Sequence, residues 1–486
     1  MNKKVSASLG ILLVIIVCVG IYGVYKPLPE YVGYESDVYM VNNADVELLV
    51  DRTYKGEDGE QKFEHQIFDT MLEHIETADS FILADMFLFN DQRGQASSVG
   101  RELSAEFANA LVEKSTASPD TAITLITDPI NSAYGSYLPT PLSVVHASEI
   151  NFITTDLTTL RDSNPLYSAL WRTALRFVPN IGGNWLPNPF DPNHEKATLS
   201  AYLSAFNFKA NHRKLLLTDY QVDGVRSWRT LITSMNPHDG SSRHSNVGVV
   251  VRNAFAADVL KTEEAIVEFS GGQMPTLPSF QVVSDESGGE VGVQLLTERK
   301  IKDRILQNIN QLEEGDELLM AVFYFSDRDI VKAIKKADER GASIRILLDP
   351  NKNAFGREKN GIPNRQVSHE LMEHTSGNTT VRWCSTLEEQ CHSKIVMTKI
   401  GEDYELILGS ANLTRRNLDN LNLETNVRII GTIETSAIED GVTFFEDQWG
   451  NEGGLEYSLS YKTYADSSLL KTLQYRFGEY TGISHY

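Results

Sequence analysis

Several residue classes are too scarce in this chain to support some common kinds of protein. Only 3 of its 486 residues are cysteines and none forms a CxxC pair, which excludes a disulfide-built scaffold and gives no zinc-site spacing. Gly and Pro number 33 and 16, so collagen-like and low-complexity chains are excluded as well. Basic residues are outnumbered, with 44 Lys and Arg against 66 Asp and Glu. The resulting formal net charge of −22 disfavours broad nucleic-acid binding, although a small, locally basic site remains compatible with it.

The N-terminus carries an uncharged apolar run, Val5–Tyr25. Its length of about 20 residues is what an α-helix needs to cross the hydrocarbon core of a bilayer. Lys3 and Lys4 precede the run, and acidic residues follow Lys26. By the positive-inside rule we expect a single-pass transmembrane helix at residues 5–25, with a cytoplasmic N-terminus and an extracytoplasmic catalytic part. A cleaved signal peptide and a buried soluble helix are the alternatives.

Export would also bear on the two C-terminal cysteines, Cys384 and Cys391. An oxidising compartment would permit a disulfide between them, directly before His392. Two unpaired thiols are equally compatible with the sequence, because spacing alone does not fix the separation of the two Cα atoms.

Several blocks of the chain recur in the same order, which indicates an internal duplication. The paired blocks are VELLVDR (from Val46) with VQLLTER (from Val293), DSFILADMFLFND with DELLMAVFYFSD, ITLITDPINSAYG with IRILLDPNKNAFG, and NHRKLLLTD with CHSKIVMTK. Nearly continuous apolar strands that alternate with helices favour an α/β fold, here two duplicated lobes, each a mixed β-sheet flanked by helices. The predicted units are a first lobe at 46–270, a linker at 271–292, a second lobe at 293–451 and a C-terminal tail at 452–486.

Each half carries one His-x-Lys pair. His212 and Lys214 are followed by Asp219 and complete the pattern HxKxxxxD. His392 and Lys394 repeat the spacing, but Lys399 occupies the position of the acid. The apolar residues after each pair predict a buried strand, on which residues i and i+2 share a face.

A second polar cluster follows each pair. Ser234 and Asn236 lie in ITSMN, and Ser410 and Asn412 lie in LGSAN. Lys supplies a positive charge and Asn and Ser supply hydrogen bonds for a phosphodiester anion. A neutral His can attack phosphorus while a second, protonated His donates to the leaving oxygen. One copy offers only one of these groups, so the duplication has a chemical rationale.

With these motifs the chain resembles the phospholipase D superfamily, whose signature is two HxKxxxxD motifs, each followed by a GS-x-N-type segment. The resemblance implies a two-lobed α/β fold, a shared active site without metal or other cofactor, and a covalent phosphohistidine. It assigns His212 as nucleophile and His392 as general acid, with Lys214 and Lys394 in the same site. Phosphate binding falls to Asn236, Asn412, Ser234 and Ser410, and Asp219 is a structural residue of its motif.

In the family, an acidic residue downstream in one half orients the histidine of the other. Glu424, in ETNVRII, matches the position that supports His212. In HSNVGVVV of the first half the aligned residue is His244, with Asp239 nearby, so the partner of His392 stays open. Lys399 in place of the second motif's Asp puts the geometry of that half in doubt more than its chemistry.

The first half has an insertion, about residues 157–211, that the second half lacks. It contains LYSALWRTALRFVP, which predicts either a basic amphipathic helix at a headgroup interface or a lid or packing helix. We expect a membrane-anchored phosphodiesterase or phosphatidyltransferase that acts on phospholipids, with nucleic acid and protein partners not expected. An exported phosphodiesterase on single-stranded nucleic acid and a non-catalytic membrane-tethered binding protein are the alternatives.

Overall fold

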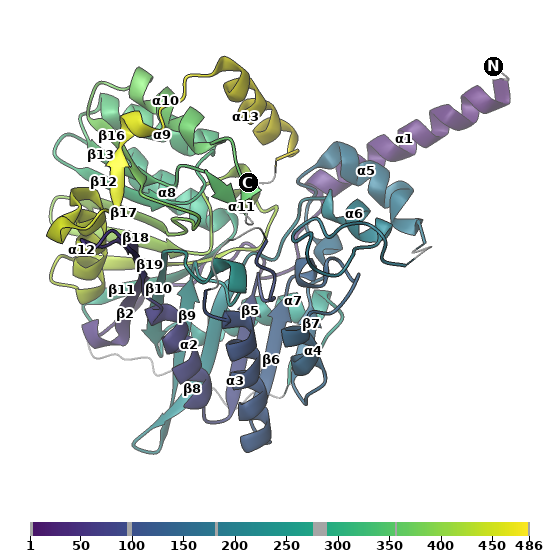
Figure 1. Cartoon of the computed structure of the whole chain (residues 1–486), viewed down its shortest axis with the longest axis horizontal. Coiled ribbons are helices and arrows are strands. Elements are labelled where there is room, and N and C mark those ends of the chain that lie inside the picture. Colours follow the sequence, from purple (N-terminus) through teal and green to yellow (C-terminus); the bar gives the residue numbers. More distant parts are fainter. Residues whose placement is uncertain (1–2, 95–99, 180–182, 276–288, 355–356, 485–486) are drawn as a thin grey trace.

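Two mixed β-sheets form the body of the protein (Figure 1). The computed structural model describes residues 3–94, 100–179, 183–275, 289–354 and 357–484. The first sheet has seven strands in the spatial order β2 (Val46–Asp51), β10 (Asn246–Arg252), β9 (Val225–Thr233), β8 (Lys214–Val222), β5 (Phe81–Met86), β6 (Ala122–Thr127) and β7 (Asn151–Thr154). The second has nine, in the order β1 (Tyr39–Val41), β11 (Val291–Thr297), β19 (Thr425–Thr432), β18 (Asp403–Gly409), β17 (Lys394–Ile400), β12 (Glu317–Val322), β13 (Ser343–Leu348), β16 (Thr379–Cys384) and β20 (Ser458–Ser460).

The order of the first sheet recurs inside the second. The spatial order of the strands is the same in both: β2-β10-β9-β8-β5-β6-β7 in the first sheet corresponds to β11-β19-β18-β17-β12-β13-β16 in the second. In both sheets the last three of these strands pair in parallel and the others pair antiparallel. The predicted mixed α/β fold with two repeated lobes is therefore confirmed.

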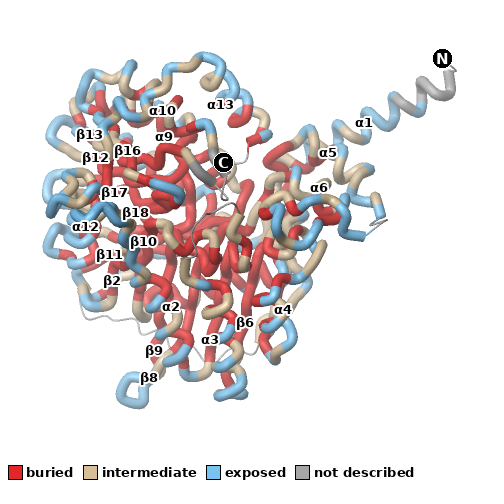
Figure 2. Tube along the Cα trace, in the orientation of Figure 1, coloured by how far each residue is buried: buried red, intermediate tan, exposed pale blue. Residues whose placement is uncertain are grey.

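Helices cover the outer face of each sheet, and two more helices join the core that the two sheets share. Their bounds are α2 (Gln66–Glu76), α3 (Leu103–Ala117), α4 (Thr140–His146), α7 (Ala256–Phe269), α8 (Arg299–Gln311), α9 (Arg328–Glu339), α10 (Asn364–His374), α12 (Ser436–Gly450) and α13 (Leu469–Thr481). Residues of α2, α3 and α4 share one core with the outer face of the first sheet, and residues of α8, α9 and α10 share another with the outer face of the second. A third core contains residues of both sheets together with residues of α7 and α12. Figure 2 shows that the strands of both sheets are mostly buried.

Strand alternation explains this layering. On β8, Leu215 and Leu217 belong to the central core, whereas Leu216 faces the outer core of the first lobe. On β17, Ile395 and Met397 likewise join the central core. Because the central core is continuous across both lobes, and each buried aliphatic side chain contributes about 1.5–3 kcal/mol, the two lobes form one packed unit.

Both ends of the chain add to the second lobe. Strand β1 precedes the first lobe in sequence but pairs with β11, with Tyr39 opposite Val293. The predicted tail contains β20, which pairs with β16, and α13, whose Tyr475 is buried in the core of the second lobe. Most of the predicted linker, residues 276–288, lies outside the described residues.

The apolar run at the N-terminus forms α1 (Lys3–Tyr25), which projects from the body beside α5 (Pro165–Thr173) (Figure 1). Among the described residues, no helix combines the length and the apolarity that crossing a membrane requires, so the predicted transmembrane helix is wrong. Its C-terminal turns contact protein instead: a Cβ on Gly20 would lie 3.2 Å from Ala169 Cβ, and Gly23 O accepts from Asp162 N at 2.9 Å. Lys26 Nζ then donates to Thr158 O at 2.6 Å, which fastens the end of the helix to the insertion.

The remaining elements are short. They are the hairpin β3 (Thr53–Lys55) and β4 (Gln61–Phe63), the pair β14 (Asn353–Ala354) and β15 (Arg357–Glu358), α6 (Leu199–Ala205), α11 (Arg415–Leu418), and 3-10 turns at Asn43–Asp45, Pro129–Ser132, Leu157–Thr159, Leu175–Phe177, Asp239–Ser241, Glu452–Gly454 and Tyr461–Thr463. The insertion predicted at residues 157–211 contains α5, α6 and the turns at 157–159 and 175–177.

Candidate active site

The two His-x-Lys segments meet where the two sheets abut. His212 N donates to Leu423 O and His392 N donates to Ser245 O, each at 2.9 Å, so each histidine is fixed by backbone of the other lobe. Strands β8 and β17 begin at Lys214 and Lys394, directly after these contacts. Both histidines line one cavity of about 420 Å³. The fold therefore brings together two segments that lie 180 residues apart.

His212 is backed by a carboxylate from the other lobe. Its Nδ1 lies 3.0 Å from Glu424 Oε2, and the Glu424 side chain is fully buried. Ser410 Oγ donates to the same oxygen at 2.5 Å, and Asn417 Nδ2 donates to Glu424 Oε1. With Nδ1 engaged, the other ring nitrogen, Nε2, is left for the cavity.

His392 is backed by an amide. Its Nδ1 lies 3.1 Å from Asn246 Oδ1, and Ser234 Oγ donates to that oxygen at 3.0 Å. The residue that faces His392 is therefore Asn246. His244 lies beside His392 instead, with 5.7 Å between the ring centroids.

Strand register explains why the sequence alignment placed His244 at this position. The shared Asn-Val dipeptides aligned His244 with Glu424, but Gly248 pairs with Thr233 while Asn426 pairs with Gly409. The structurally equivalent residue of Glu424 is thus Asn246, two residues further along. Asp239, the other candidate, accepts from Ser104 N at 3.0 Å.

The two lysines are buried beside their own histidines. Lys214 Nζ donates to His212 O at 2.7 Å, and Lys394 Nζ donates to His392 O at 2.6 Å. Each also lies over an aromatic ring, Phe87 at 4.9 Å and Phe323 at 5.2 Å. Burial lowers the pKa of Lys214 to about 7, and burial together with Lys214 lowers the pKa of Lys394 well below its usual value. An anion bound here would favour the charged form of both.

Burial also lowers the pKa of both histidines. It lowers the pKa of His212 to about 4 although Glu424 acts in the opposite direction. For His392, burial and the nearby Lys394 lower the pKa well below 6.5. At neutral pH without ligand, both rings are neutral, which suits an attacking nitrogen.

The predicted phosphate-binding residues divide into two groups. Asn236 and Asn412 line the cavity with the histidines. Asn236 Oδ1 accepts from Leu88 N at 3.2 Å, which leaves its NH₂ group to donate. Ser234 and Ser410 lie behind the histidines, where each hydroxyl orients the side chain that holds Nδ1.

Asp219 lies within β8, further along the strand from the cavity. Its carboxylate accepts from Ser80 N at 2.9 Å and Phe81 N at 2.8 Å, and so ties β8 to the start of β5. Lys399, at the same position in the second lobe, pairs with Glu317 at 3.4 Å at the start of β12. In the second lobe the acid thus lies on the neighbouring strand and pairs with the lysine.

The repeated Asp-Pro motif contributes two buried acids that were given no role from the sequence. Asp128 Oδ2 accepts from Asn211 N at 2.7 Å, and Asp349 Oδ2 accepts from Cys391 N at 2.8 Å. Each thereby fixes the residue directly before a catalytic-site histidine. Burial raises the pKa of both carboxyls to about 7. Recurrence of the motif in both halves was the signal that could have found them.

A buried charge cluster joins the lobes directly behind the site. Arg213, between His212 and Lys214, pairs with Glu263 at 2.6 Å and with Glu298 of the second lobe at 2.7 Å, all fully buried. Glu298 in turn accepts from Glu424 N at 3.0 Å. The backbone that carries Glu424 is thus linked to the backbone that carries His212.

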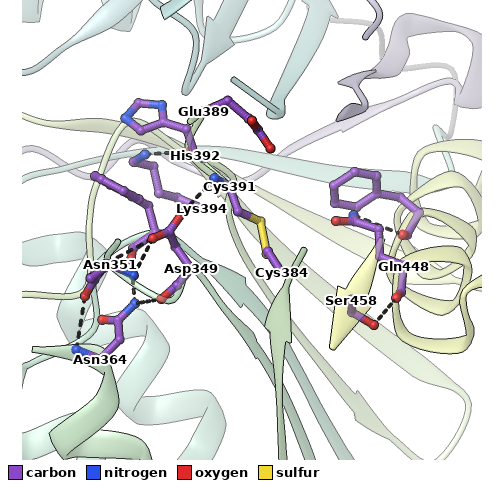
Figure 3. The surroundings of a disulfide bond; sticks show 12 residues. Asp349, Asn351, Asn364, Cys384, Glu389, Cys391, His392, Lys394, Gln448 and Ser458 are labelled. Atoms are coloured by element: carbon purple, nitrogen blue, oxygen red, sulfur yellow. Dashed lines mark hydrogen bonds between the residues drawn. A yellow bond between two sulfur atoms is a disulfide. The ribbon is translucent and has the colours of Figure 1, made fainter. Parts of the chain in front are cut away.

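Cys384 and Cys391 form a disulfide with a Cα–Cα distance of 6.2 Å (Figure 3). Cys391 directly precedes His392, and the bond joins it to the end of β16. Asp349 and Asn351 lie on the other side of the same segment (Figure 3). The segment before His392 is therefore fixed by one covalent bond and one carboxylate.

The insertion and α11 complete the cavity wall. The insertion provides apolar and aromatic side chains, together with residues of the first sheet's loops: Tyr134, Pro189, Phe190, Tyr202, Phe206 and Phe208. Arg416 of α11 lines the cavity over the Phe208 ring, at 5.1 Å, and donates to Ser484 O near the C-terminus. A second cavity of about 490 Å³ shares Arg93, Gly240, His244 and Glu388 with the first. Within the described part of the chain, no group of three or more His, Cys, Asp and Glu residues is arranged to hold a metal ion.

Comparison with protein families gives one match, residues 305–449, to the family described as "Cardiolipin synthase, PLD-like domain". The match covers most of the second lobe, which is therefore similar to a phospholipase D-like domain. The matched range contains His392, Lys394, Asn412 and Glu424. The resemblance to the phospholipase D superfamily is confirmed, and members of this superfamily are phosphodiesterases and phosphatidyltransferases.

One of the similar solved structures shows the same fold. The crystal structure of phosphatidylserine synthase from Haemophilus influenzae Rd KW20 has a TM-score of 0.53 at 12% identity, over 92% of this chain and 95% of that one. Polyphosphate kinase from Porphyromonas gingivalis has a TM-score of 0.41 at 13% identity over 79% and 48%. Nuc, a phospholipase D family member from Salmonella typhimurium, has 0.26 at 20% identity over 33% and 95%. At 12% identity, the likeness to phosphatidylserine synthase shows a shared fold and nothing more, and the other two structures are too different to indicate even that. No curated protein sequence matches the chain.

Proposed function

We propose that this chain is a phospholipase D-like phosphodiesterase or phosphatidyltransferase that acts on phospholipids through a phosphohistidine at His212. The observation that carries the proposal is the pairing of a carboxylate-backed His212 with an amide-backed His392 around one cavity. Two asparagines line the same cavity, and two buried lysines lie beside the histidines.

The proposed reaction has two displacement steps. His212 Nε2 attacks phosphorus, the bond from phosphorus to the headgroup oxygen breaks, and His392 Nε2–H gives its proton to that oxygen. Water or an alcohol then attacks the phosphohistidine, gives its proton back to His392, and His212 leaves. Glu424 stabilises the positive charge that His212 carries between the two steps, as a carboxylate does behind a catalytic imidazole.

The phosphate oxygens are held by cations and amides. Lys214 and Lys394 supply the positive charge, and Asn236 and Asn412 supply hydrogen bonds. Because all four are buried and fixed, little reorganisation is needed when charge develops on phosphorus.

The cavity lining supports a phospholipid in preference to a nucleic acid. Most of its exposed wall is apolar, with aromatic rings from the insertion on one part and polar Arg93, His244 and Glu388 on another. An acyl glycerol fits the first and a polar headgroup fits the second. The matching family description, which names cardiolipin synthase, supports the same substrate class.

Helix α13 supports a substrate presented in a lipid surface. Leu469, Leu473 and Tyr480 are 80%, 67% and 86% exposed and fall, with Leu470 and Phe477, within an arc of roughly 100° on the helix. The opposite side of α13 packs on the protein through Tyr475 and Glu479, and Glu479 accepts from Arg415 N at 2.9 Å beside the cavity residue Arg416. An outward apolar face next to the cavity suits insertion into a bilayer surface.

This role of α13 has a direct test. Leu473→Glu should reduce turnover of phosphatidylglycerol in vesicles at least several-fold and leave turnover of a short-chain, monomeric phospholipid within twofold. Equal losses on both substrates would refute a lipid-surface role for this face.

The disulfide supports work in an oxidising, extracytoplasmic compartment. Thiol labelling of the protein directly from its host cells, before and after reduction, measures its state there. Protection of Cys384 and Cys391 until reduction supports this location, and immediate labelling of both counts against it.

The activity itself is tested with two substrates. Purified protein is incubated with labelled phosphatidylglycerol and with a labelled single-stranded oligonucleotide, each with EDTA. Lipid turnover that His212→Ala abolishes supports the proposal, with His369→Ala on the surface of α10 as the matched control. Cleavage of the oligonucleotide alone would establish a nuclease, and binding of lipid without turnover would establish a binding protein. Acid-quenched label on His392 would reverse the assigned roles.

A further inference from the structure

The two histidines of the site have partners of different charge. Glu424 and Asn246 occupy equivalent positions behind His212 and His392, and each receives a hydrogen bond from the equivalent serine, Ser410 or Ser234. The backbone repeats as well: Thr425 N donates to Ser410 Oγ at 2.9 Å, and Val247 N donates to Ser234 Oγ at 3.1 Å. In this shared set of hydrogen bonds the two halves differ in one functional group, a carboxylate in one half and an amide in the other.

The amide of Asn246 has a defined orientation. Its Nδ2 donates to His244 O at 3.0 Å, while its Oδ1 accepts from Ser234 Oγ and faces His392 Nδ1. Turning the amide over would place its NH₂ group against a hydroxyl donor and a carbonyl oxygen against a carbonyl oxygen. His392 must therefore carry a proton on Nδ1, and its Nε2 is the nitrogen that gains and loses a proton in the cavity.

The charged groups around His392 do not replace the missing carboxylate. Lys394 of β17, Lys214 of β8, His212 and His244 all disfavour a positive charge on the His392 ring. Asp349 is bonded to Cys391 N, and Glu389 accepts from Leu387 N and Glu388 N within its own loop, so neither hydrogen-bonds to the ring. Glu424 is engaged with His212.

We propose that Asn246 is a positioning residue that fixes the His392 ring while leaving it uncharged, so that His392 takes up its proton only when an anionic phosphate enters the site. The two halves then have different roles. The carboxylate of Glu424 stabilises the positive charge that His212 carries as phosphohistidine, whereas the neutral amide of Asn246 does not stabilise a charge on His392, which can therefore release its proton easily. This inference rests on the proposed roles of the two histidines. It adds that the amide, in place of a carboxylate, sets when His392 is protonated.

The first test reads the ring directly and needs no turnover. Nitrogen NMR of the full-length protein with ¹⁵N-labelled histidine, with His392 assigned by its loss in His392→Gln, reports protonation and tautomer. We expect a neutral ring with hydrogen on Nδ1 at pH 7 in the wild type, and conversion to imidazolium on addition of vanadate as a phosphate analogue. A ring already charged at pH 7, or one with hydrogen on Nε2, would overturn the proposal.

The second test changes the partner. Asn246→Asp should raise the pKa of His392 by about 1–3 units, since a close opposite charge favours the charged ring. The falling limb of the kcat/KM profile against pH should move upward by the same amount, because protonated His392 persists to higher pH. Asn310→Asp, the same substitution on the exposed side of α8, is the matched control and should move neither quantity.

These measurements distinguish a failure of the proposed function from a failure of the role given to Asn246. If no phospholipid is turned over but the NMR states are as expected, the proposed function fails and the role of Asn246 stands. If turnover occurs and Asn246→Asp shifts neither the ring nor the pH profile, the role of Asn246 is wrong and the proposed function stands. Asn246→Ala, which keeps no acceptor for Nδ1, should lower kcat with the profile unshifted; an unchanged kcat would also count against positioning.

Discussion

Replacing Glu424 by glutamine removes one buried negative charge from behind His212 and keeps the shape of the side chain. In the wild type the carboxylate faces His212 Nδ1 at 3.0 Å and accepts from Ser410 and Asn417. A glutamine has only one oxygen for these three donors. Whichever way it turns, its NH₂ group meets a donor, Asn417 on one side or Ser410 and His212 on the other.

The magnitude follows from what the charge does during the reaction. A hydrogen bond to a charged group contributes about 1.5–3 kcal/mol, and His212 becomes charged only as phosphohistidine forms. A loss of about 2–3 kcal/mol in the transition state is about a 30- to 160-fold lower rate. Glu424 also opposes the effect of burial on the pKa of His212, which lies at about 4. Without it this pKa falls further, so the rising limb of kcat/KM should move to lower pH.

Rapid-quench measurement of phosphohistidine formation with labelled phosphatidylglycerol checks this prediction. Glu405→Gln is the matched control, since Glu405 pairs with Arg428 in the same sheet without touching either histidine. Its rate of phosphohistidine formation should equal that of the wild type. A rate for Glu424→Gln within threefold of wild type, with the variant folded, would refute the role given to this carboxylate.

Three further predictions concern stability. Arg213→Met leaves Glu263 and Glu298 buried without their cation and should lower the free energy of unfolding in urea by about 3–5 kcal/mol; a loss below 1 kcal/mol would contradict it. Burial raises the pKa of Asp51 to about 8, so its folded form holds a proton that the unfolded chain releases near pH 4, and stability falls as pH rises between these values. Asp51→Asn, which does not titrate, should therefore gain in Tm relative to wild type from pH 5 to pH 9, and a constant Tm difference would count against this. Replacing Cys384 and Cys391 by serine opens a short loop and should lower stability by about 2–3 kcal/mol in the loop-entropy model, measured by urea unfolding against the reduced wild type, which should match the variant.

Local patterns in the sequence determined much of this fold. Apolar strands such as FILADM and ELLMAV are buried on both faces, and their repetition with the same turns predicted two α/β lobes. The His-x-Lys spacing was sufficient to place each lysine beside its histidine, because short motifs fix which side chains share a strand face. Both histidines line one cavity. The acid behind His212 could also be named, since Glu424 follows its motif at the family's distance.

Other features depended on contacts between distant segments. The partner of His392 is set by the register of β10 against β9, which shifts the equivalent position by two residues to Asn246. The sequence Asn-Val occurs in both halves and gave the wrong alignment, because identity of a dipeptide carries no information about strand register. Strand β1 joins the sheet of the other lobe, a pairing that no local pattern records.

The N-terminal apolar run is a further case in which the local sequence predicted the element but not its contacts. Its hydropathy determined that Lys3–Tyr25 is a helix, but its packing against α5 and Asp162 through Gly20 and Gly23 was decided by the fold. The disulfide likewise required a Cα–Cα distance of 6.2 Å, which spacing along the chain does not provide. The sequence by itself thus determined the chemical groups of this protein and the elements that carry them. The tertiary structure decided which group faces which, because strand register and interlobe packing are set by contacts between strands and lobes that no single motif contains.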